Sequence, residues 1–147
     1  MTTTYDDLDR IERTINIDAP AERVWGLLVR PGWWSNEGEV DAEPTVRREG
    51  VVDVVVHEKF GEFRLLTLRS EPPRHIAYRW IDPGSEAGTL VEFFVEDRAG
   101  GVTLRVVESG FQGLGKSRDE VVRHVQGNTE GWEQELEVAR RFVTVDA

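Results

Sequence analysis

The sequence predicts an α+β fold, in which a curved antiparallel β-sheet wraps around one long C-terminal helix and short helices follow the first strand. Three observations lead to this prediction. A strand pattern and a short helical pattern open the chain, strand-like segments follow at hairpin spacing, and a helical pattern closes it at about 117–144. Strands and helices that are segregated along a chain favour antiparallel pairing. Because one helix covers only one face of a sheet, we expect the sheet to bend around it.

Composition narrows the class of protein. The chain has 147 residues, of which 39% are hydrophobic and 31% charged, and this is typical of one globular domain with one core. Its 18 Lys and Arg against 28 Asp and Glu give a formal net charge of -10. Nucleic acids and anionic membranes are polyanions, so this charge argues against both as partners. The absence of cysteine excludes disulfides and thiolate zinc sites.

The N-terminal part begins with polar and acidic residues, and we expect residues 1–9 to form a flexible tail before a single domain at 10–147. This start lacks the features of a secretory signal, and no apolar run approaches the roughly 20 residues of a membrane span, so we expect a cytoplasmic protein without membrane insertion. Apolar and polar residues alternate in 11–17, which predicts a strand with one buried face. The spacing then becomes helical, which predicts a short helix at about 20–30 that Pro31-Gly32 ends.

The middle of the chain is rich in β-branched and aromatic residues, in segments that turn signals separate. We expect strands at 45–48, 51–58, 62–70, 75–81, 89–96 and 102–109. The glycine-rich stretch 110–115 matches neither a phosphate-binding loop nor a dinucleotide fingerprint. We interpret it as a flexible connection into the last helix, near the mouth of a cavity.

The last helix carries apolar residues at helical spacing along one face. They are Val121, Val125, Trp132, Leu136, Ala139 and Val143. Gly127 and Gly131 lie just before Trp132, although a glycine inside a helix costs about 1 kcal/mol relative to alanine. Two interpretations stay open. The glycines either let the helix approach the sheet closely, or they leave an empty volume beside Trp132 that forms the inner end of a ligand cavity.

Several stretches together resemble a known superfamily. The opening INIDAPAERVWGLLV, the pair Trp33-Trp34, the strand AYRW, the ending VTLRVVESGF and the C-terminal GWEQELEVARRFV are similar, in order and spacing, to START-like (SRPBCC) proteins. The branch that the chain resembles most is named after the activator of the heat-shock-protein ATPase. The resemblance covers about residues 10–145. It implies a helix-grip fold with a cavity between sheet and helix, and its members include lipid-transfer proteins and polyketide cyclases.

Nine residues are candidates to line such a cavity: Trp34 in an aromatic turn at 33–40, and eight others that we expect on the sheet and the last helix. They are Trp34, Phe63, Tyr78, Trp80, Phe93, Val106, Glu108, Asn128 and Trp132. The aromatic ones are equally typical of a packed core. Glu108 is a weak catalytic candidate: it shares a face with Leu104 and Val106, and a carboxylate turned into apolar space would have a raised pKa. The alternative is a solvated Glu108 at the end of its strand.

The three histidines, His57, His75 and His124, show no metal-binding spacing, so we predict neither a metal site nor a cofactor. Three functions then compete. The first is binding of a small hydrophobic or amphipathic ligand, such as a lipid or a polyketide-like metabolite. The second is a cyclase or aromatase acting on a polyketide-like substrate, with Glu108, Tyr78 or Asn128 serving, although the sequence shows no paired acid and base.

The third function is stimulation of a chaperone ATPase by direct interaction. We rank this function last, because the co-chaperones of the branch also need an additional domain, for which we expect no room in 147 residues. A homodimer is compatible with the sequence but nothing in it demands one.

Overall fold

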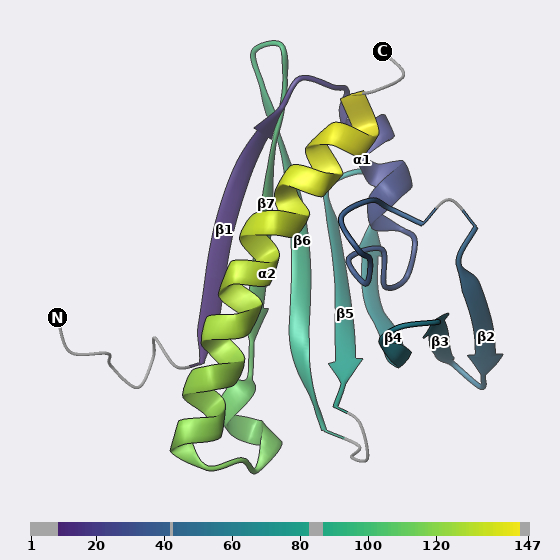
Figure 1. The fold of residues 1–147 in the computed structure, drawn as a ribbon. Coiled ribbons are helices and arrows are strands. Elements are labelled where there is room, and N and C mark those ends of the chain that lie inside the picture. The colour runs from purple at the N-terminus through teal and green to yellow at the C-terminus, as the bar shows by residue number, and fades with distance from the viewer. Residues whose placement is uncertain (1–8, 42, 83–86, 145–147) are drawn as a thin grey trace, which may run out of the picture.

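A single antiparallel sheet and one long helix dominate the computed structural model, which describes residues 9–41, 43–82 and 87–144 (Figure 1). The elements are β1 (Arg10–Ile17), α1 (Ala21–Leu28), β2 (Thr45–Glu49), β3 (Val52–His57), β4 (Gly61–Glu71), β5 (His75–Ile81), β6 (Gly88–Arg98), β7 (Gly101–Ser109), the 3-10 helix η2 (Phe111–Leu114) and α2 (Arg118–Thr144). The predicted α+β helix-grip fold is therefore confirmed. The expected tail at 1–9 lies, apart from Asp9, outside the described residues.

The sheet is a meander with one exception. Its strand order is β1-β7-β6-β5-β4-β3-β2, so strands from β2 to β7 pair with their neighbours along the chain, whereas β1 pairs with β7 at the far edge. The chain crosses from one edge to the other through α1 and the loop after it (Figure 1). The sheet is open, with β1 and β2 as its edges, and α2 runs diagonally across one face.

Alternation of side chains decides which face α2 covers. In β6, buried and half-buried positions alternate from Gly88 to Val95, as expected for a strand with one face on the core. Cross-strand register places Ile11, Glu108, Val91 and Tyr78 in one row, and all four are buried. This row belongs to the inner face, so the register places a carboxyl group among apolar side chains.

The helix α2 begins at a capping box. The Ser117 hydroxyl accepts a hydrogen bond from the backbone N–H of Glu120 at 3.2 Å, which satisfies one of the free donors of the first turn. The six apolar residues that we expected along one face are all buried, as is Val138. The 27-residue helix is therefore held by packing on the sheet more than by its own propensity.

Neither of the two α2 glycines is a spacer for close packing. A Cβ atom added at Gly127 or Gly131 would meet no atom within 4 Å, and neither residue lines the cavity described below. Both interpretations that the sequence left open are thus wrong. Close approach occurs instead at Gly101, where a Cβ would collide with the backbone carbonyl of Ile17. An alanine there would push β1 away from the start of β7.

The stretch before α2 also differs from the sequence interpretation. It contains η2, whose Phe111 is fully buried, and it is not merely a flexible connection. The backbone N–H of Gly110 donates to the carbonyl of Asp9 at 3.0 Å, and Gly110 has a φ of 91°, a conformation that glycine adopts without strain. The segment is anchored by one aromatic ring and by a bond to the start of β1.

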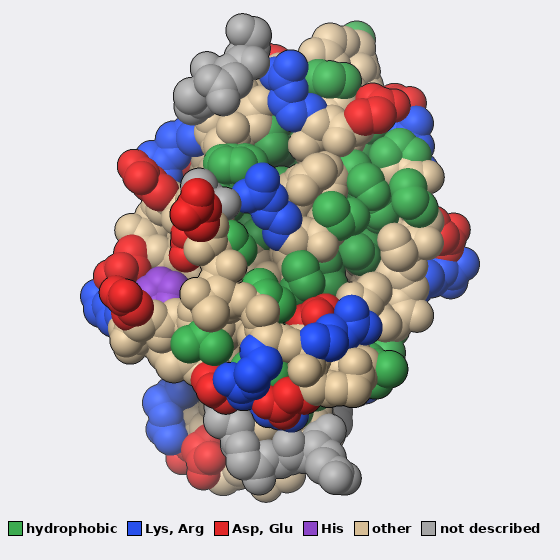
Figure 2. All heavy atoms as spheres, turned by 90° about the vertical axis from the view of Figure 1, so that its right-hand side faces the viewer, with side chains coloured by type: hydrophobic (Ala, Val, Ile, Leu, Met, Phe, Trp, Pro, Cys, Tyr) green, Lys and Arg blue, Asp and Glu red, His purple; other side chains and the backbone are tan. Residues whose placement is uncertain are grey.

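The side of the molecule that carries β2 shows acidic and basic side chains with hydrophobic ones between them (Figure 2). Every residue of β2 is exposed. Arg47 pairs with Glu49 at 2.6 Å and with Glu62 at 3.1 Å, and Arg64 pairs with Glu49 at 2.9 Å. Charges on an edge strand discourage pairing with another sheet. Within the described ranges, no helix is both long and apolar enough to cross a membrane.

Candidate functional site

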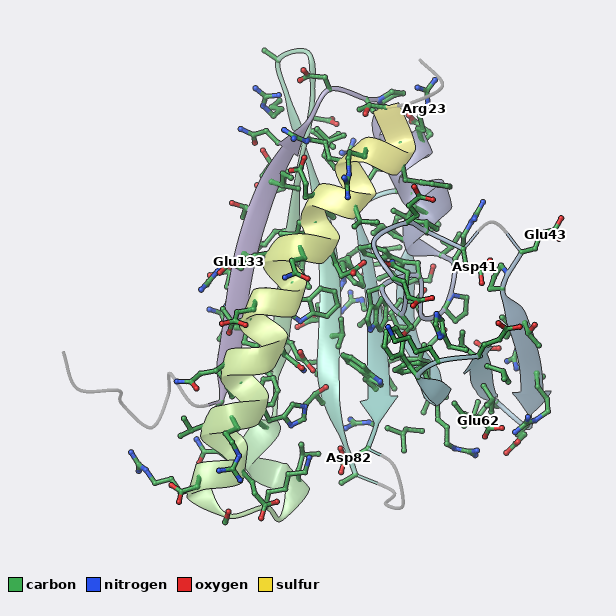
Figure 3. All side chains as sticks on the ribbon, in the orientation of Figure 1. Arg23, Asp41, Glu43, Glu62, Asp82 and Glu133 are labelled. Carbon is green, nitrogen blue, oxygen red and sulfur yellow. The ribbon has the colours of Figure 1, made fainter. Side chains whose placement is uncertain are left out.

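A cavity of about 190 Å³ lies between the inner face of the sheet and α2. It is lined by Phe60, Glu62, Phe63, Trp80, Ile81, Asp82, Thr89, Glu108, Leu114, His124 and Asn128. Figure 3 places Glu62 and Asp82 at the lower end of β4 and β5, which is the end of the molecule where α2 begins. The mouth of the cavity is therefore at this end, and the cavity runs inward along the first turns of α2.

A second hollow is larger but differs in character. This groove of about 700 Å³ lies on the surface between α2 and the loop around Asn36, and five glutamates line it. We take the smaller cavity as the candidate site for two reasons. It is enclosed by the sheet and the helix as the fold predicts, and it alone of the two reaches a fully buried polar group.

The nine residues that the sequence suggested divide into two groups. Four of them, Phe63, Trp80, Glu108 and Asn128, line the cavity. The other five, Trp34, Tyr78, Phe93, Val106 and Trp132, do not line it and are buried in the core. The inner face is therefore filled by side chains over more of its area than the sequence interpretation assumed, and the binding role of the four lining residues stays a prediction.

Trp34 is the centre of the filled part. Its ring lies 5.7 Å from Tyr78, 5.6 Å from Trp80, 5.5 Å from Phe93 and 5.5 Å from Trp132, measured between ring centroids. These distances are typical of tilted and edge-to-face aromatic pairs. The cluster joins the turn after α1 to β5, β6 and α2, and so stabilises the contact of the helix with the sheet.

Tyr78 has a structural role. Its hydroxyl donates a hydrogen bond of 2.6 Å to the backbone carbonyl of Leu28, at the end of α1. Burial raises the pKa of Tyr78, because the phenolate would be poorly solvated in the core. A phenol that is neutral, buried and already bonded to the backbone does not serve as an acid or base in the cavity.

Glu108 lies at the inner end of the cavity and is fully buried. Its Oε2 accepts a hydrogen bond of 2.5 Å from the Thr89 hydroxyl. Its Oε1 accepts one of 2.9 Å from Asn128 Nδ2 and another of 2.9 Å from Trp132 Nε1. Burial raises the pKa of Glu108, and the three donors oppose this rise without cancelling it. The alternative of a solvated glutamate at the strand end is therefore wrong.

Spacing along the elements explains how these groups meet. Asn128 and Trp132 are four residues apart and so lie on one face of α2. Thr89 precedes Val91 by two residues on β6, and Val91 pairs directly with Glu108 on β7. The strand period of two therefore turns Thr89 to the inner face beside Glu108. Thr89 was missed by the sequence interpretation, although its alternation with Val91 and Phe93 carried the signal.

His124 was also missed as a site residue. It is one turn before Asn128 on the same face of α2, and it lines the cavity. Its Nδ1 is buried, and in the described part of the chain no hydrogen-bond partner reaches this atom. Burial lowers the pKa of His124 and the Lys116 charge lowers it further, so the imidazole is neutral at pH 7. Helical spacing from Asn128 would have identified it.

The mouth of the cavity carries charge. Lys116 pairs with Asp82 at 3.3 Å, and Glu62 pairs with Arg47 as described above. Phe60 lies at the hairpin between β3 and β4 with about half of its side chain exposed, and it stacks on His57 with 4.6 Å between the ring centroids. Among the described residues, no group of three potential metal ligands is close enough to hold an ion. The cavity thus combines a charged mouth, ring walls and a polar inner end.

Comparison with known proteins agrees with this fold. The family model described as "Activator of Hsp90 ATPase homolog 1-like protein" matches residues 18–139. No curated protein sequence matches the chain. A solved structure from Mesorhizobium loti is 23% identical with a TM-score of 0.66, and the match covers 90% of this chain and 94% of that one.

Two further solved structures are similar over most of their length. A polyketide-cyclase-like protein from Corynebacterium glutamicum is 18% identical with a TM-score of 0.63, and the match covers 93% of this chain and 92% of that one. The Aha1 dimer from Colwellia psychrerythraea is 16% identical with a TM-score of 0.59, with 89% of this chain and 96% of that one covered. Such low identities show a common fold and no more.

The family match is of a different kind, because it extends from the loop before α1 into the last turns of α2. It includes the strands and the part of the helix that enclose the cavity. Together with the helix-grip topology, it identifies the chain as a member of the Activator of Hsp90 ATPase homolog 1-like family within the START-like superfamily.

Proposed function

We propose that the chain binds a small, neutral and mostly apolar molecule of about one ring in the cavity between the sheet and α2. The observation that carries this proposal is the cavity itself, which has aromatic walls at Phe63 and Trp80 and a polar inner end at Glu108 and Asn128. Ligand sites combine mostly apolar walls with a few polar groups that orient the ligand, and this arrangement has both.

The volume limits the size of the ligand. An apolar cavity of about 150 Å³ is known to hold a benzene molecule, whereas sites for drug-sized ligands span about 300–1,000 Å³. The 190 Å³ found here therefore fits a single ring with one or two substituents. A long-chain lipid or a multi-ring polyketide exceeds this volume unless side chains move.

The polar groups around the cavity limit the charge of the ligand. Glu62 and Asp82 line the cavity, and a carboxylate ligand would be repelled by them, whereas Glu108, whose pKa is raised by burial, offers such a ligand no positive partner. The His124 ring lines the cavity and is neutral, and its buried Nδ1 has no hydrogen-bond partner among the described residues. In the tautomer that carries its proton on Nε2, Nδ1 is an acceptor, and a small rotation of the ring would turn it toward a ligand. A hydroxyl group on the ligand would donate to this nitrogen. A phenol-like molecule thus combines the size, the apolar ring and the donor that the cavity accommodates.

The experiment compares phenol with toluene, which has the same size but no hydroxyl donor. Isothermal titration calorimetry of the full chain is expected to show binding of both, with phenol the tighter. The variant His124→Phe removes the acceptor, so phenol should lose roughly fivefold in affinity, as expected for a hydrogen bond of about 1 kcal/mol, and toluene should lose little. His75→Phe, on the opposite face of the sheet, is the matched control. Absence of heat for both probes would end the proposal.

A second candidate is an enzyme, because the cavity brings together two titratable groups with opposite shifts. Burial raises the pKa of Glu108, which favours its protonated form, and lowers the pKa of His124, which favours its neutral form. Two groups with opposite shifts along one cavity support proton transfer as a second proposal. In this candidate, His124 would take a proton from the carbon beside a ketone while Glu108 donates a hydrogen bond to the carbonyl oxygen.

The conservative variant Glu108→Gln separates binding from catalysis. Its amide oxygen still accepts from Asn128 and Trp132, and its amide nitrogen donates to Thr89, so the cavity should keep its shape. Exchange of the methyl protons of acetophenone in D₂O, followed by NMR, is expected to be faster with the wild type than with this variant. Equal rates for wild type, variant and buffer would remove the enzyme candidate and leave binding untouched.

Stimulation of a chaperone ATPase and assembly into a homodimer stay predictions. The family name and one dimeric relative of the same fold support them, but the described residues of this chain offer no further argument for either. Light scattering of the purified chain decides the assembly. A chaperone ATPase assay with added protein decides the stimulation.

A further inference from the structure

We propose that Trp34 is the residue that limits ligand size, because its indole occupies a place that would otherwise accept a neutral two-ring aromatic molecule. This inference rests on the proposed ligand-binding function of the cavity and deepens it. Trp34 does not line the cavity itself. It fills the space behind the cavity wall, between the inner face of the sheet and α2.

The surroundings of Trp34 are those of a bound aromatic ligand. Besides the four rings described above, Trp33 lies 5.9 Å away with its ring almost perpendicular. Five aromatic rings thus surround one indole, which is 6% exposed. They come from the turn after α1, from β5, β6 and α2. The cage formed by these rings, Trp33, Tyr78, Trp80, Phe93 and Trp132, accepts a flat bicyclic group, and at present a side chain occupies it.

The Trp34 indole is well packed, but its N–H group lacks a hydrogen bond. Its Nε1 is buried, and no hydrogen-bond acceptor within the described ranges reaches it. A buried tryptophan usually finds a partner for this donor, and leaving it unpaired is unfavourable. Trp33 Nε1 and Ser35 Oγ are buried and unpaired in the same way. In the turn at 33–35, packing of the rings therefore leaves these three polar atoms without partners among the described residues.

Two shared side chains connect the cage to the cavity. Trp80 lines the cavity on one side and contacts Trp34 on the other. Trp132 contacts Trp34 and donates its Nε1 hydrogen bond to Glu108, at the inner end of the cavity. Without the Trp34 indole, a small shift of Trp80, which is only half-buried at the boundary, would join the vacated space to the cavity. The cavity would then extend into the cage.

The test uses three neutral probes: phenol, indole and 2-naphthol. Wild type is expected to bind phenol and to bind 2-naphthol at least about tenfold more weakly. The variant Trp34→Ala should reverse this order, bind 2-naphthol at least about tenfold more tightly than wild type does, and gain thermal stability from added indole, which replaces the missing side chain. Affinities come from calorimetry, and the position of each probe comes from methyl NMR or a crystal structure.

The matched control is Trp33→Ala. It removes an indole from the same turn, but Trp33 contacts Trp34 and Phe93 and stands away from the cavity wall. This variant should therefore keep the wild-type order of affinities. If Trp34→Ala does not fold, Trp34→Leu retains an apolar side chain and opens a smaller volume, and 2-naphthol must still bind it more tightly than wild type.

The outcomes separate the two proposals. If wild type binds phenol but no folded Trp34 variant gains affinity for a two-ring probe, the inference about Trp34 is wrong and the proposed function stands. The inference is equally wrong if Trp33→Ala gains as much affinity as Trp34→Ala. If wild type binds no phenol, the proposed function fails. Binding of indole inside the cage of Trp34→Ala would then still show that the cage accepts a bicyclic ring.

Discussion

Three donors converge on the buried Glu108, and each of them compensates part of the cost of placing a carboxylate in the core. Thr89 comes from β6, whereas Asn128 and Trp132 come from α2. The carboxyl group therefore bonds the sheet to the helix as well as closing the cavity. Removing one donor should weaken the fold and change the proton affinity of Glu108 at the same time.

The variant Trp132→Phe tests this double role. Loss of the Nε1 donor should lower the free energy of unfolding by about 1–3 kcal/mol. It should also raise the pKa of Glu108 further, since the lost hydrogen bond favoured the charged form. The loss of stability is therefore expected to be larger at pH 8 than at pH 5. Denaturant unfolding at both values measures it, and an equal loss at both would contradict the assignment.

Glu135 provides a second pH-dependent contribution, outside the cavity. Burial raises the pKa of its carboxyl from 4.5 to about 7, against the hydrogen bond of 2.7 Å that Asn36 donates. Because the pKa is raised in the folded state, the stabilising contribution is complete below about pH 4.5 and is lost as the pH rises through about 7.

The variant Glu135→Gln mimics the protonated form and keeps the bond to Asn36. It should match wild type at pH 4.5 and be more stable by about 1 kcal/mol at pH 8, a value reduced for partial solvent exposure. Denaturant unfolding at each pH gives the difference. Glu130→Gln, which changes an exposed glutamate of the same helix, controls for the change in net charge. A variant no more stable than wild type at pH 8 would contradict the raised pKa.

At the level of single residues, the sequence predicted which side chains face inward. It did not predict which of them line the cavity and which are packed in the core. Strand periods placed Trp80 and Glu108 on the inner side, and the helix period placed Trp132 there. Whether a ring lines a cavity or fills it depends on side-chain packing between four elements, and a periodic pattern contains no such information. His124 differs, because its spacing of four residues from Asn128 placed it on the same face of the helix, and this signal was present in the sequence.

Among the elements, α2 is the one whose local sequence opposes its structure most clearly. Gly127 is exposed and its missing side chain would contact nothing, so packing does not account for it. We expect Gly127→Ala to raise the free energy of unfolding by about 0.5–1 kcal/mol, through helix propensity and a less flexible unfolded chain. Thermal unfolding of the variant measures the change.

The matched substitution is Gly101→Ala at the start of β7. Here the new Cβ would collide with the Ile17 carbonyl, so stability should fall instead of rising. Changes of opposite sign in the free energy of unfolding of the two variants would show that the glycines have different roles. Destabilisation by both would mean that Gly127 has a contact that the static structure does not show.

Element boundaries were predictable because each element has a strong local signal. The strand at Thr45–Glu49 and the helix at Arg118–Thr144 each differ by one residue from the expectation. The 3-10 helix η2 was not predicted, because Phe111 stands alone between glycines and its burial depends on distant parts of the chain. Short elements fixed by tertiary contacts lack the repetition from which a sequence pattern is recognised.

Over the whole molecule, stability is expected to be uneven across the sheet. Strands β5, β6 and β7 are paired on both sides and bury their inner residues, whereas β2 is an edge strand with every residue exposed. Amide hydrogen exchange should therefore be slowest in β6 and β7 and fastest in β2. Mass spectrometry of exchanged peptides measures the order. Protection in β2 equal to that in β6 would indicate a covering partner, such as a second copy of the chain.

The fold of the whole chain followed from the order of its elements, but the ligand did not. Family membership and related structures of the same fold leave the chemistry open, since one fold hosts many functions. The ligand depends on a volume of about 190 Å³ and on the few polar atoms around it. Both result from packing, and Trp34 changes them without belonging to the cavity.

The position of the tryptophans has one more consequence. Trp80 forms part of the cavity wall, and Trp132 holds a hydrogen bond to Glu108. The fluorescence of an indole responds to the polarity around it and to quenching by nearby groups. The unlabelled protein should therefore signal both occupancy and protonation through its own ultraviolet emission, and small compounds could be screened by light alone.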